Sequence, residues 1–285
     1  MISSLVKYLK FKIAKFQFDR DEEIRFYLTS RGFFSEINNL IFAIYFCEVN
    51  NKKIVIDTSS FVYEWNKNEQ CILNCNYKLV KDAHSDLKEK AIKNLEKSYI
   101  WMSIRSKKFK ALLNDVSVIE KLREIQDKLY VLNPSYFNFE NEMISKEYVG
   151  LHIRRNDKVY GKYKEANKVD LSEYLSMIPK CFRDLPLFIV TDDDSVLKEL
   201  KSSYPSKKVY SYFDKEDIRI DEKNFAKADK TYIRKHIINF LRDVDLLINS
   251  KCFIGSYSSN VGRFIALKRN FVNTYSVDCE WNEMH

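Results

Sequence analysis

Apolar and polar residues alternate in blocks over residues 148–275, and the blocks have the lengths of strands and helices. The run from 185 to 191 is apolar almost throughout, as in strands that are buried on both faces of a parallel sheet. In residues 231–250 the apolar side chains recur every third or fourth position, which predicts an amphipathic helix. The pattern further predicts strands at 148–153, 208–213, 252–255 and 271–275, and helices at 170–182, 195–204 and 260–268.

The first half of the chain contains one similar unit, followed by less regular sequence. The unit is predicted as a strand at 24–29, a turn at 30–35, an apolar helix at 37–49 and a strand at 53–57. Residues 59–80 are irregular and aromatic, and two mostly helical stretches, 82–114 and 117–130, lead to Asn133-Pro134. We therefore expect two lobes, 1–140 and 141–285, with the boundary within residues 133–146.

Repeated strand–helix units predict an α/β fold with parallel, doubly wound sheets. In such sheets ligands bind beyond the carboxyl ends of the strands. The three predicted strand ends that carry polar residues are therefore the candidate functional segments: 152–158, 191–194 and 256–260.

Composition adds little to this picture, but it excludes some classes of protein. Among the 285 residues 45% are apolar and 31% are charged, which is typical of a globular protein and excludes a disordered one. The net charge of +8 suits an anionic ligand such as a nucleoside diphosphate, although a solvated lysine-rich face explains it equally well. The basic residues are dispersed and no nucleic-acid-binding motif occurs, so we expect no nucleic-acid partner.

The location of the protein is predicted from its cysteines and its N-terminus. The six cysteines lack zinc-site spacing, and we interpret them as reduced thiols. No segment approaches the ~20 apolar residues of a membrane span, and lysines interrupt residues 1–18, which therefore do not form a signal peptide. We expect a cytoplasmic protein in which residues 1–18 form a packing helix; peripheral membrane contact is the alternative.

The strand that ends at Ile153 is followed by two arginines, an aspartate and a lysine. Arginine offers a planar fork to phosphate oxygens, and lysine offers a compact charge. Cations at this place can stabilise a diphosphate leaving group without a metal ion. Arg154 or Arg155 together with Lys158 are the candidates, whereas an Arg–Asp pair that fixes a loop is the structural alternative.

These residues also carry a resemblance to a known family. The segment from His152 to Val159, HIRRNDKV, resembles the HxRRxDKV motif of the α-1,6-fucosyltransferases, which include core and nodulation fucosyltransferases. The segment from Phe188 to Asp193 resembles the family's strand ending in TDD. Asp243 with the segment SSNVGR at 258–263 resembles its D…SSQVxR pattern, with Asn260 in place of glutamine. The resemblance covers about residues 125–277; Gly32 stands where the family has a GxGxQ-type loop whose second glycine is missing here.

The resemblance implies two Rossmann-like lobes in the glycosyltransferase-B style, with the acceptor-side lobe first and the lobe that binds the GDP-sugar second. It also implies an inverting, metal-independent transfer of L-fucose from GDP-β-L-fucose to a glycan hydroxyl, with no cofactor. The residues it assigns to donor binding are Gly32, His152, Asp192, Asp193, Asp243, Ser258, Ser259, Asn260 and Arg263. Of these, His152 and Asp243 are expected at guanine, and Ser259 with Asn260 at the β-phosphate; Arg154 is expected at the diphosphate.

The general base is less well defined. The family has a glutamate four residues after its lysine, but Lys162 occupies that position here. An inverting transfer needs a base near the acceptor hydroxyl. Asp157 and Glu165 are the remaining candidates, and with Arg154, Arg155 and Lys158 they complete the predicted catalytic set.

Three alternatives stay open. Asp192 and Asp194 form a DxD string that can chelate a divalent cation, although Asp194 and Ser195 also suit a helix N-cap. The enzyme could be an α-1,2-type fucosyltransferase or use another GDP-sugar. A protein that binds a glycan or a nucleic acid without catalysis is the third alternative.

Overall fold

The computed structural model describes residues 2–29, 31–61, 63, 73–74, 77–80, 99–132, 147–155, 169–212 and 229–282. The chain divides into two compact units, Met1–Asn133 and Pro134–His285. The predicted boundary at residue 140 lies within 133–146, outside the described residues. Within the described ranges, no helix is both long and apolar enough to cross a membrane.

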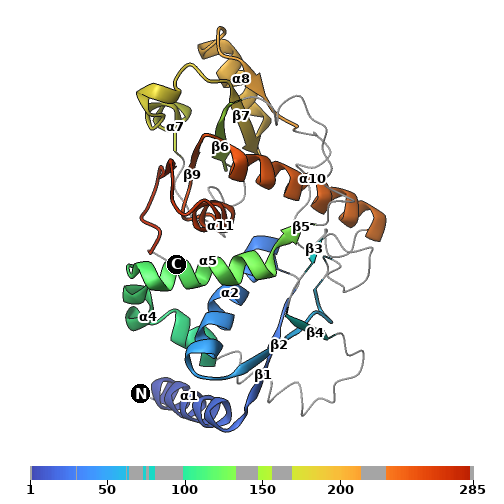
Figure 1. The fold of residues 1–285 in the computed structure, drawn as a ribbon, viewed down its shortest axis with the longest axis vertical. Coiled ribbons are helices and arrows are strands. Elements are labelled where there is room, and N and C mark those ends of the chain that lie inside the picture. Colours follow the sequence, from blue (N-terminus) through green and yellow to red (C-terminus); the bar gives the residue numbers. More distant parts are fainter. Residues whose placement is uncertain are drawn as a thin grey trace. The chain divides into compact units, whose positions relative to one another are not determined.

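The first unit is built on a short parallel sheet (Figure 1). The sheet has the strand order β1-β2-β4, and a separate antiparallel pair joins β3 and β5. The strands are β1 (Glu23–Tyr27), β2 (Lys53–Asp57), β3 (Leu73–Asn74), β4 (Lys78–Val80) and β5 (Val131–Leu132). The helices are α1 (Ile2–Arg20), α2 (Phe33–Val49), α4 (Lys107–Leu112) and α5 (Val116–Leu129).

Helix α2 forms the core of this unit because its sequence is apolar almost throughout. Twelve of its residues are buried, from Phe33 to Cys47. The helix ends at Val49, and Asn51 follows with φ 55°, a left-handed conformation that asparagine tolerates better than most residues. The guanidinium of Arg25, in the middle of β1, pairs at 2.8 Å with the buried carboxylate of Asp57, the last residue of β2. The predicted strand 53–57 is confirmed, and the predicted helix 37–49 begins four residues earlier.

The second unit contains a five-stranded sheet in which every neighbouring pair is parallel. Its order is β10-β9-β6-β7-β8. The strands are β6 (Val149–Ile153), β7 (Leu187–Thr191), β8 (Val209–Tyr210), β9 (Cys252–Gly255) and β10 (Thr274–Ser276). The connecting helices are α7 (Leu171–Ser176), the 3-10 turn η1 (Lys180–Phe182), α8 (Asp194–Ser203), α10 (Lys230–Asn249) and α11 (Asn260–Lys268). Both sheets that carry the units are parallel, as the sequence predicts.

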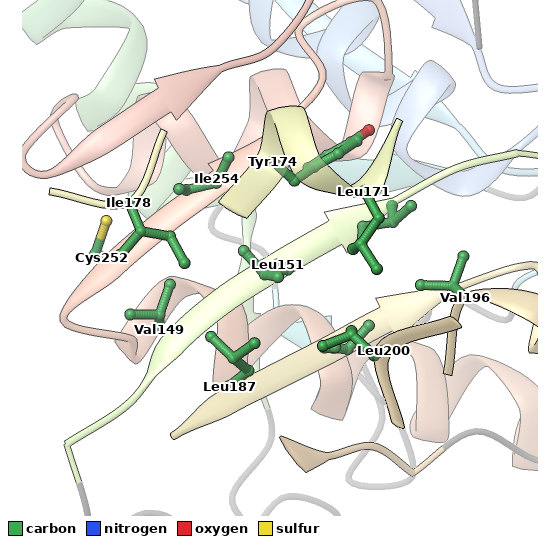
Figure 2. Packing of buried hydrophobic residues seen from close by; sticks show 12 residues of the cluster. Val149, Leu151, Leu171, Tyr174, Ile178, Leu187, Val196, Leu200, Cys252 and Ile254 are labelled. Carbon is green, nitrogen blue, oxygen red and sulfur yellow. The ribbon is translucent and has the colours of Figure 1, made fainter. Parts of the chain in front are cut away.

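The two faces of the large sheet are covered by different helices. On one face, alternate residues of β6, β7 and β9 pack against α7 and α8 in one apolar cluster (Figure 2). On the other face, a Cβ built on Gly150 would lie 3.0 Å from Leu247 of α10. Since successive strand residues point to opposite faces, His152 lies on the same side as Gly150, the side of α10. This alternation explains why Leu151 and Ile153 are in the cluster of Figure 2 and His152 is not.

Most predicted elements of this unit are confirmed, and the exceptions have local causes. The capping box at Asp170 is present, but α7 ends at Ser176 and a separate 3-10 turn follows Pro179, so the predicted helix 170–182 is broken. The last strand begins at Thr274, not at 271, because Asn270, Phe271 and Asn273 all have positive φ. The described cysteines Cys47, Cys181, Cys252 and Cys279 form no disulfide with one another; Cys47 and Cys252 are buried, and Cys181 is exposed.

Helix α11 begins very close to the end of β9. A Cβ on Gly262 would lie 2.1 Å from the carbonyl oxygen of Ser256. This is a backbone atom, so no side-chain rotation can relieve the clash. Glycine therefore allows the first turn of α11 to pack directly on the strand end. Because Gly262 has no side chain, it also fixes the position of residues 256–259, which connect β9 to α11.

We predict that Gly262→Ala lowers the free energy of unfolding by about 1–3 kcal/mol, the usual cost of forcing an extra carbon into a packed site. Urea unfolding followed by circular dichroism measures the change. Lys201→Ala, on the exposed side of α8, serves as the control and should unfold at the wild-type urea concentration. An unchanged midpoint for Gly262→Ala would show that the strand end and the helix can move apart freely.

Candidate functional site

The strand order reverses between β6 and β9. From β6 the chain adds β7 and β8 on one side, whereas β9 and β10 lie on the other side. At such a reversal the connections leave in opposite directions and open a crevice beyond the carboxyl ends of the two strands, where ligands bind in open α/β sheets. Leu151 pairs with Ile254, so Ile153, the last residue of β6, is level with the residue that follows β9, Ser256. The structure thus brings the predicted segments 152–155 and 256–260 to one edge of the sheet.

The third predicted segment joins this edge through Asp192. The backbone N–H of Arg155 donates to Asp192 Oδ1 at 2.8 Å, and Arg154 Nε lies 3.8 Å from Asp192 Oδ2. One carboxylate therefore links the end of β7 to the end of β6. This hydrogen bond fixes the backbone at Arg155, next to Arg154.

The two adjacent arginines occupy different environments. About a third of the Arg154 side chain is exposed (32%), compared with 6% of the Arg155 side chain. Arg155 turns toward α8, where its Nη1 donates to Glu199 Oε2 at 2.7 Å, and its Nε and Nη2 have no hydrogen-bond partner among the described residues. This placement favours Arg154 for contact with a ligand and Arg155 for holding α8 against the end of β6.

Each carboxylate of the Asp192–Asp194 run has a partner within the protein. Asp193 is the N-cap of α8 and accepts from the Ser195 N–H at 2.9 Å, a role that the sequence predicts for Asp194 or Ser195. Asp194 pairs with Lys198 at 2.7 Å on the exposed face of the same helix. Among the residues that the structure describes, no group of three His, Cys, Asp or Glu side chains could hold a metal ion. Metal independence remains a prediction, and these ion pairs supply a structural reason for the acidic run.

His152 is a buried, neutral imidazole. Burial, and secondarily the nearby charge of Arg154, lowers the pKa of His152 to about 3, so it carries no charge at neutral pH. Its Nδ1 is buried without a hydrogen-bond partner in the described part of the chain. Buried polar atoms in proteins are nearly always hydrogen-bonded, so this nitrogen is available to a ligand that enters the crevice.

Asp243 lies on α10, the helix that covers the His152 face of the sheet. The neighbouring Arg242 donates from Nη2 to Asp243 Oδ1 at 3.0 Å, and both side chains are mostly buried. Arg242 also stacks over Tyr212, 4.2 Å from the ring centroid. Asp243 is therefore held as a carboxylate on the same side of the sheet as His152.

The loop after β9 ends in a helix N-terminus that carries an unpartnered hydroxyl. Ser259 is the N-cap of α11, but its side chain makes no capping hydrogen bond, and its Oγ is buried without a partner within the described ranges. The first N–H groups of a helix have no intrahelical acceptor and attract anions. Asn260 opens the helix and Arg263 lies one turn further on, both partly exposed. Ser259 with this N-terminus forms an anion-binding arrangement.

Three further predicted residues lie outside the described residues: Asp157, Lys158 and Glu165. Gly32 is in the first unit, where it is the N-cap of α2 with φ −52°. That angle is accessible to any residue, so the backbone conformation does not require glycine there.

Sequence reasoning missed Asp278, which follows the last strand. Its carboxylate accepts hydrogen bonds from the loop 256–258 that leads to Ser259. The rule that selects polar residues at strand ends also selects Asp278 when it is applied to β10, the strand that ends two residues earlier.

Comparison with known proteins identifies the class of this site. Residues 137–271 match the family model described as alpha-(1,6)-fucosyltransferase N- and catalytic domains. This range contains every predicted site residue of the second unit, and the match supports glycosyltransferase activity of the fucosyltransferase class. Within that class the resemblance to the α-1,6-fucosyltransferases is confirmed. The comparison with curated proteins found no match.

Solved structures of fucosyltransferases share the fold. NodZ alpha-1,6-fucosyltransferase co-crystallized with GDP matches with a TM-score of 0.51 and 14% identity, over 89% of this chain and 93% of that one. Fucosyltransferase NodZ from Bradyrhizobium matches with a TM-score of 0.51 and 13% identity, over 89% and 94%. A mutant of Arabidopsis thaliana FUT1 in complex with GDP matches with a TM-score of 0.51 and 10% identity, over 91% and 73%. These matches confirm the predicted α/β architecture in the glycosyltransferase-B style.

We predict that His152 makes the protein less stable in mild acid. Its folded pKa is depressed below the ordinary value of 6.5, so its contribution to stability is complete above pH 6.5 and is lost as the pH falls toward 3. From about pH 7 to about pH 5, the wild type should lose roughly 1–2 kcal/mol more unfolding free energy than His152→Gln. Urea unfolding at both pH values measures this difference. Equal losses in the two proteins would contradict a neutral, buried His152.

Proposed function

We propose that this protein is an inverting fucosyltransferase that moves L-fucose from GDP-β-L-fucose to a glycan hydroxyl without a metal ion. The family match over residues 137–271 supports the reaction class. The observation that carries the proposed donor site is the Ser259 hydroxyl at the N-terminus of α11, which has no partner among the described residues and follows β9, the neighbour of the strand that leads to the partly exposed Arg154. A diphosphate is an anion of the charge and size that such an edge can hold.

The diphosphate is both an anchor and a leaving group. When the bond between the sugar C1 and the β-phosphate oxygen breaks, negative charge grows on that oxygen. Arg154 can offer two parallel N–H donors to it, and the N-terminus of α11 with Ser259 adds fixed dipoles that need no reorganisation. A cation and a helix N-terminus aimed at the departing oxygen supply the stabilisation that a divalent metal ion supplies in other transferases.

The proposed guanine contacts lie on the side of α10. His152 is neutral and buried, so it can contact a base by stacking and by hydrogen bonding without opposing charge. A carboxylate such as Asp243 accepts from both the N1–H and the amino group of guanine, a pair of donors that adenine does not present. Recognition of GDP over other nucleotides therefore rests on Asp243 in this proposal.

The acceptor side is assigned by chemistry alone. The attacking hydroxyl must lose its proton as the new glycosidic bond forms, on the face of the sugar opposite to the departing diphosphate. Asp157 and Glu165 remain the proposed bases, with Lys158 beside them in the sequence; all three lie outside the described residues. We assign the acceptor to the first unit, as in the family that the sequence resembles.

Two alternatives use the same site differently. An α-1,2-type enzyme or a transferase for another GDP-sugar would keep the proposed phosphate and guanine contacts and change the pocket around the sugar. A protein that only binds glycan or nucleic acid would use the cationic edge without bond cleavage. The family match favours the α-1,6 type among these.

We predict fucose transfer from GDP-fucose that persists in EDTA. The assay follows GDP release and product formation with GDP-fucose, GDP-mannose and UDP-sugars, each with and without EDTA and with a panel of glycan acceptors. Turnover that is selective for fucose and resistant to EDTA supports the proposal. Activity that requires manganese, or that occurs only with a UDP-sugar, would overturn it and direct attention to Asp192 and Asp194.

Arg154→Ala is the decisive variant within this assay. Loss of a charge that acts mainly on the departing oxygen should lower kcat by about 10²–10³-fold with the fold intact by circular dichroism. Lys201→Ala removes a cation from an exposed position of α8 and should leave kcat unchanged. Wild-type activity in Arg154→Ala would remove the proposed diphosphate contact.

A further inference from the structure

Asp278 connects the last strand to the loop that precedes α11. It lies two residues beyond the end of β10, and β10 is the neighbour of β9 in the sheet. Its Oδ1 accepts from the Tyr257 N–H at 2.8 Å and from Ser276 Oγ at 2.8 Å, and its Oδ2 accepts from the Ser258 N–H at 3.3 Å and from Ser256 Oγ. One carboxylate therefore gathers four donors, three of them from the loop.

The ionised form of Asp278 is the form that these donors stabilise. Burial alone would raise the pKa of Asp278. The hydrogen bonds from Ser256, Ser258 and Ser276 together outweigh that effect, so the pKa is lowered overall. Hydrogen bonds to a charged acceptor are roughly twice as strong as those between neutral groups. The loop is thus held by a carboxylate whose lone pairs point at its donors.

The hydrogen-bond pattern gives the adjacent Ser258 and Ser259 different functions. Ser256 and Ser258 share a hydrogen bond of 2.7 Å between their hydroxyls, and Ser256 also donates to Asp278, so the proton on that shared bond comes from Ser258. The Ser258 hydroxyl proton is therefore directed into the protein. Ser259 Oγ has no partner among the residues described and keeps its proton for a ligand.

The same loop sets the position of α11. The Ser259 N–H donates to the carbonyl of Ser256 at 3.2 Å, and Gly262 packs on that carbonyl from the first turn of the helix. With the Tyr257 and Ser258 N–H groups bound to Asp278, every backbone donor from 257 to 259 is occupied within the protein. A ligand at this edge meets the Ser259 hydroxyl and the first turn of α11, in a position that Asp278 determines.

From these contacts we propose that Asp278 is a positioning residue for the donor phosphates, acting through the 256–258 loop on Ser259 and the N-terminus of α11. The inference rests on the proposed function, since it assigns a residue to the same donor site. It also predicts a specific kinetic pattern. A displaced phosphate cradle weakens binding of the donor in the ground state and the transition state alike, which raises KM more than it lowers kcat.

The test compares GDP affinity by calorimetry with the kinetics of fucose transfer. In Asp278→Asn one acceptor oxygen becomes an amide donor facing a donor of the loop. We expect the Kd for GDP and the KM for GDP-fucose each to rise by about tenfold or more, with the KM for the acceptor unchanged. Ser276→Ala, which removes one of the four donors and keeps the charge, should show the same pattern to a smaller extent and serves as the measurable variant if Asp278→Asn does not fold.

Asp115→Asn is the matched control, because Asp115 is also an aspartate that accepts from a serine N–H and hydroxyl, at the start of α5. It should lower thermal stability and leave the Kd for GDP unchanged. If Asp278→Asn behaves like this control, Asp278 has only a structural role and the inference is overturned, while the proposed function stands. If the wild type itself neither binds GDP nor transfers fucose, the proposed function and this inference both fall.

A second inference, carried by other residues, concerns α1. This helix has two opposite apolar faces. Toward the protein, Ala14 and Phe18 are buried, and Phe18 lies 5.1 Å from the Tyr99 ring between centroids. On the opposite face Leu9, Ile13 and Phe16 are exposed by 51%, 54% and 68%. Their spacing of four and three residues places these three side chains in one stripe.

The charge of α1 indicates the kind of surface that fits the exposed stripe of Leu9, Ile13 and Phe16. The sequence of α1, ISSLVKYLKFKIAKFQFDR, contains five basic residues and one acidic residue. Lys12 and Lys15 are exposed on the same helix as the stripe. Apolar side chains with lysines beside them are typical of helices that lie in the headgroup region of anionic membranes. We propose that α1 docks on an anionic lipid surface through Leu9, Ile13 and Phe16, which would bring the enzyme to membrane-borne acceptors.

Co-sedimentation with vesicles tests this second inference. The wild type should bind vesicles of equal parts phosphatidylcholine and phosphatidylserine, but not pure phosphatidylcholine. The double substitution Ile13→Asp and Phe16→Asp should lower the bound fraction by about tenfold, since two inserting side chains are lost. Val116→Asp removes an equally exposed apolar side chain (69%) from α5 and should bind as the wild type does. Absence of binding to both vesicles, or a dimer that the double substitution dissociates, would overturn the proposal.

Discussion

The proposed donor-binding edge depends on the carbonyl oxygen of Ser256, because a strand stops and a helix starts within four residues of it. Gly262 packs on this carbonyl so closely that even a Cβ would collide with it. The Ser259 N–H donates to the same oxygen, which closes the turn between β9 and α11. The direction of α11, and therefore the place where its N-terminal dipole acts on an anion, follows from this packing.

Around that turn, neighbouring residues of the same type have different partners. Arg154 stays partly exposed, whereas Arg155 is buried against Glu199. Ser258 directs its proton into the loop, whereas Ser259 has no partner in the described residues. In both pairs one residue builds the edge and the other is the contact that we propose for the ligand. A preorganised site requires this combination, because a group that binds a phosphate can be fixed in place only by neighbours whose own hydrogen bonds are already made.

The sequence predicts the elements of this edge better than it predicts their connections. Apolar runs give β9 and α11 with the bounds that the structure has, since a run of four buried residues followed by a polar turn leaves little choice. The predicted start of β10 is wrong because Phe271 and Asn273 adopt positive φ; asparagine tolerates that conformation, but phenylalanine gives no signal of it. The family resemblance identifies residues 152–159 and 258–263, but it does not distinguish Arg154 from Arg155. That difference depends on Glu199, more than forty residues away in sequence and close only in the folded protein.

The carboxylates at this cationic edge present the remaining physical question, because Asp192 and Asp278 should repel a diphosphate. In each case the negative charge is turned toward donors of the protein: Asp192 toward the Arg155 N–H and the Arg154 guanidinium, and Asp278 toward the 256–258 loop. A carboxylate whose lone pairs accept from N–H and O–H groups is partly compensated by them, and it orients the backbone dipoles around it. Tyr174 lies within electrostatic range of both carboxylates and of Arg155, and its pKa is raised mainly by burial and then by Asp278. The carboxylates at this edge thus orient the donors of the protein around them, and Arg154 with Ser259 are the contacts that we propose for the anion.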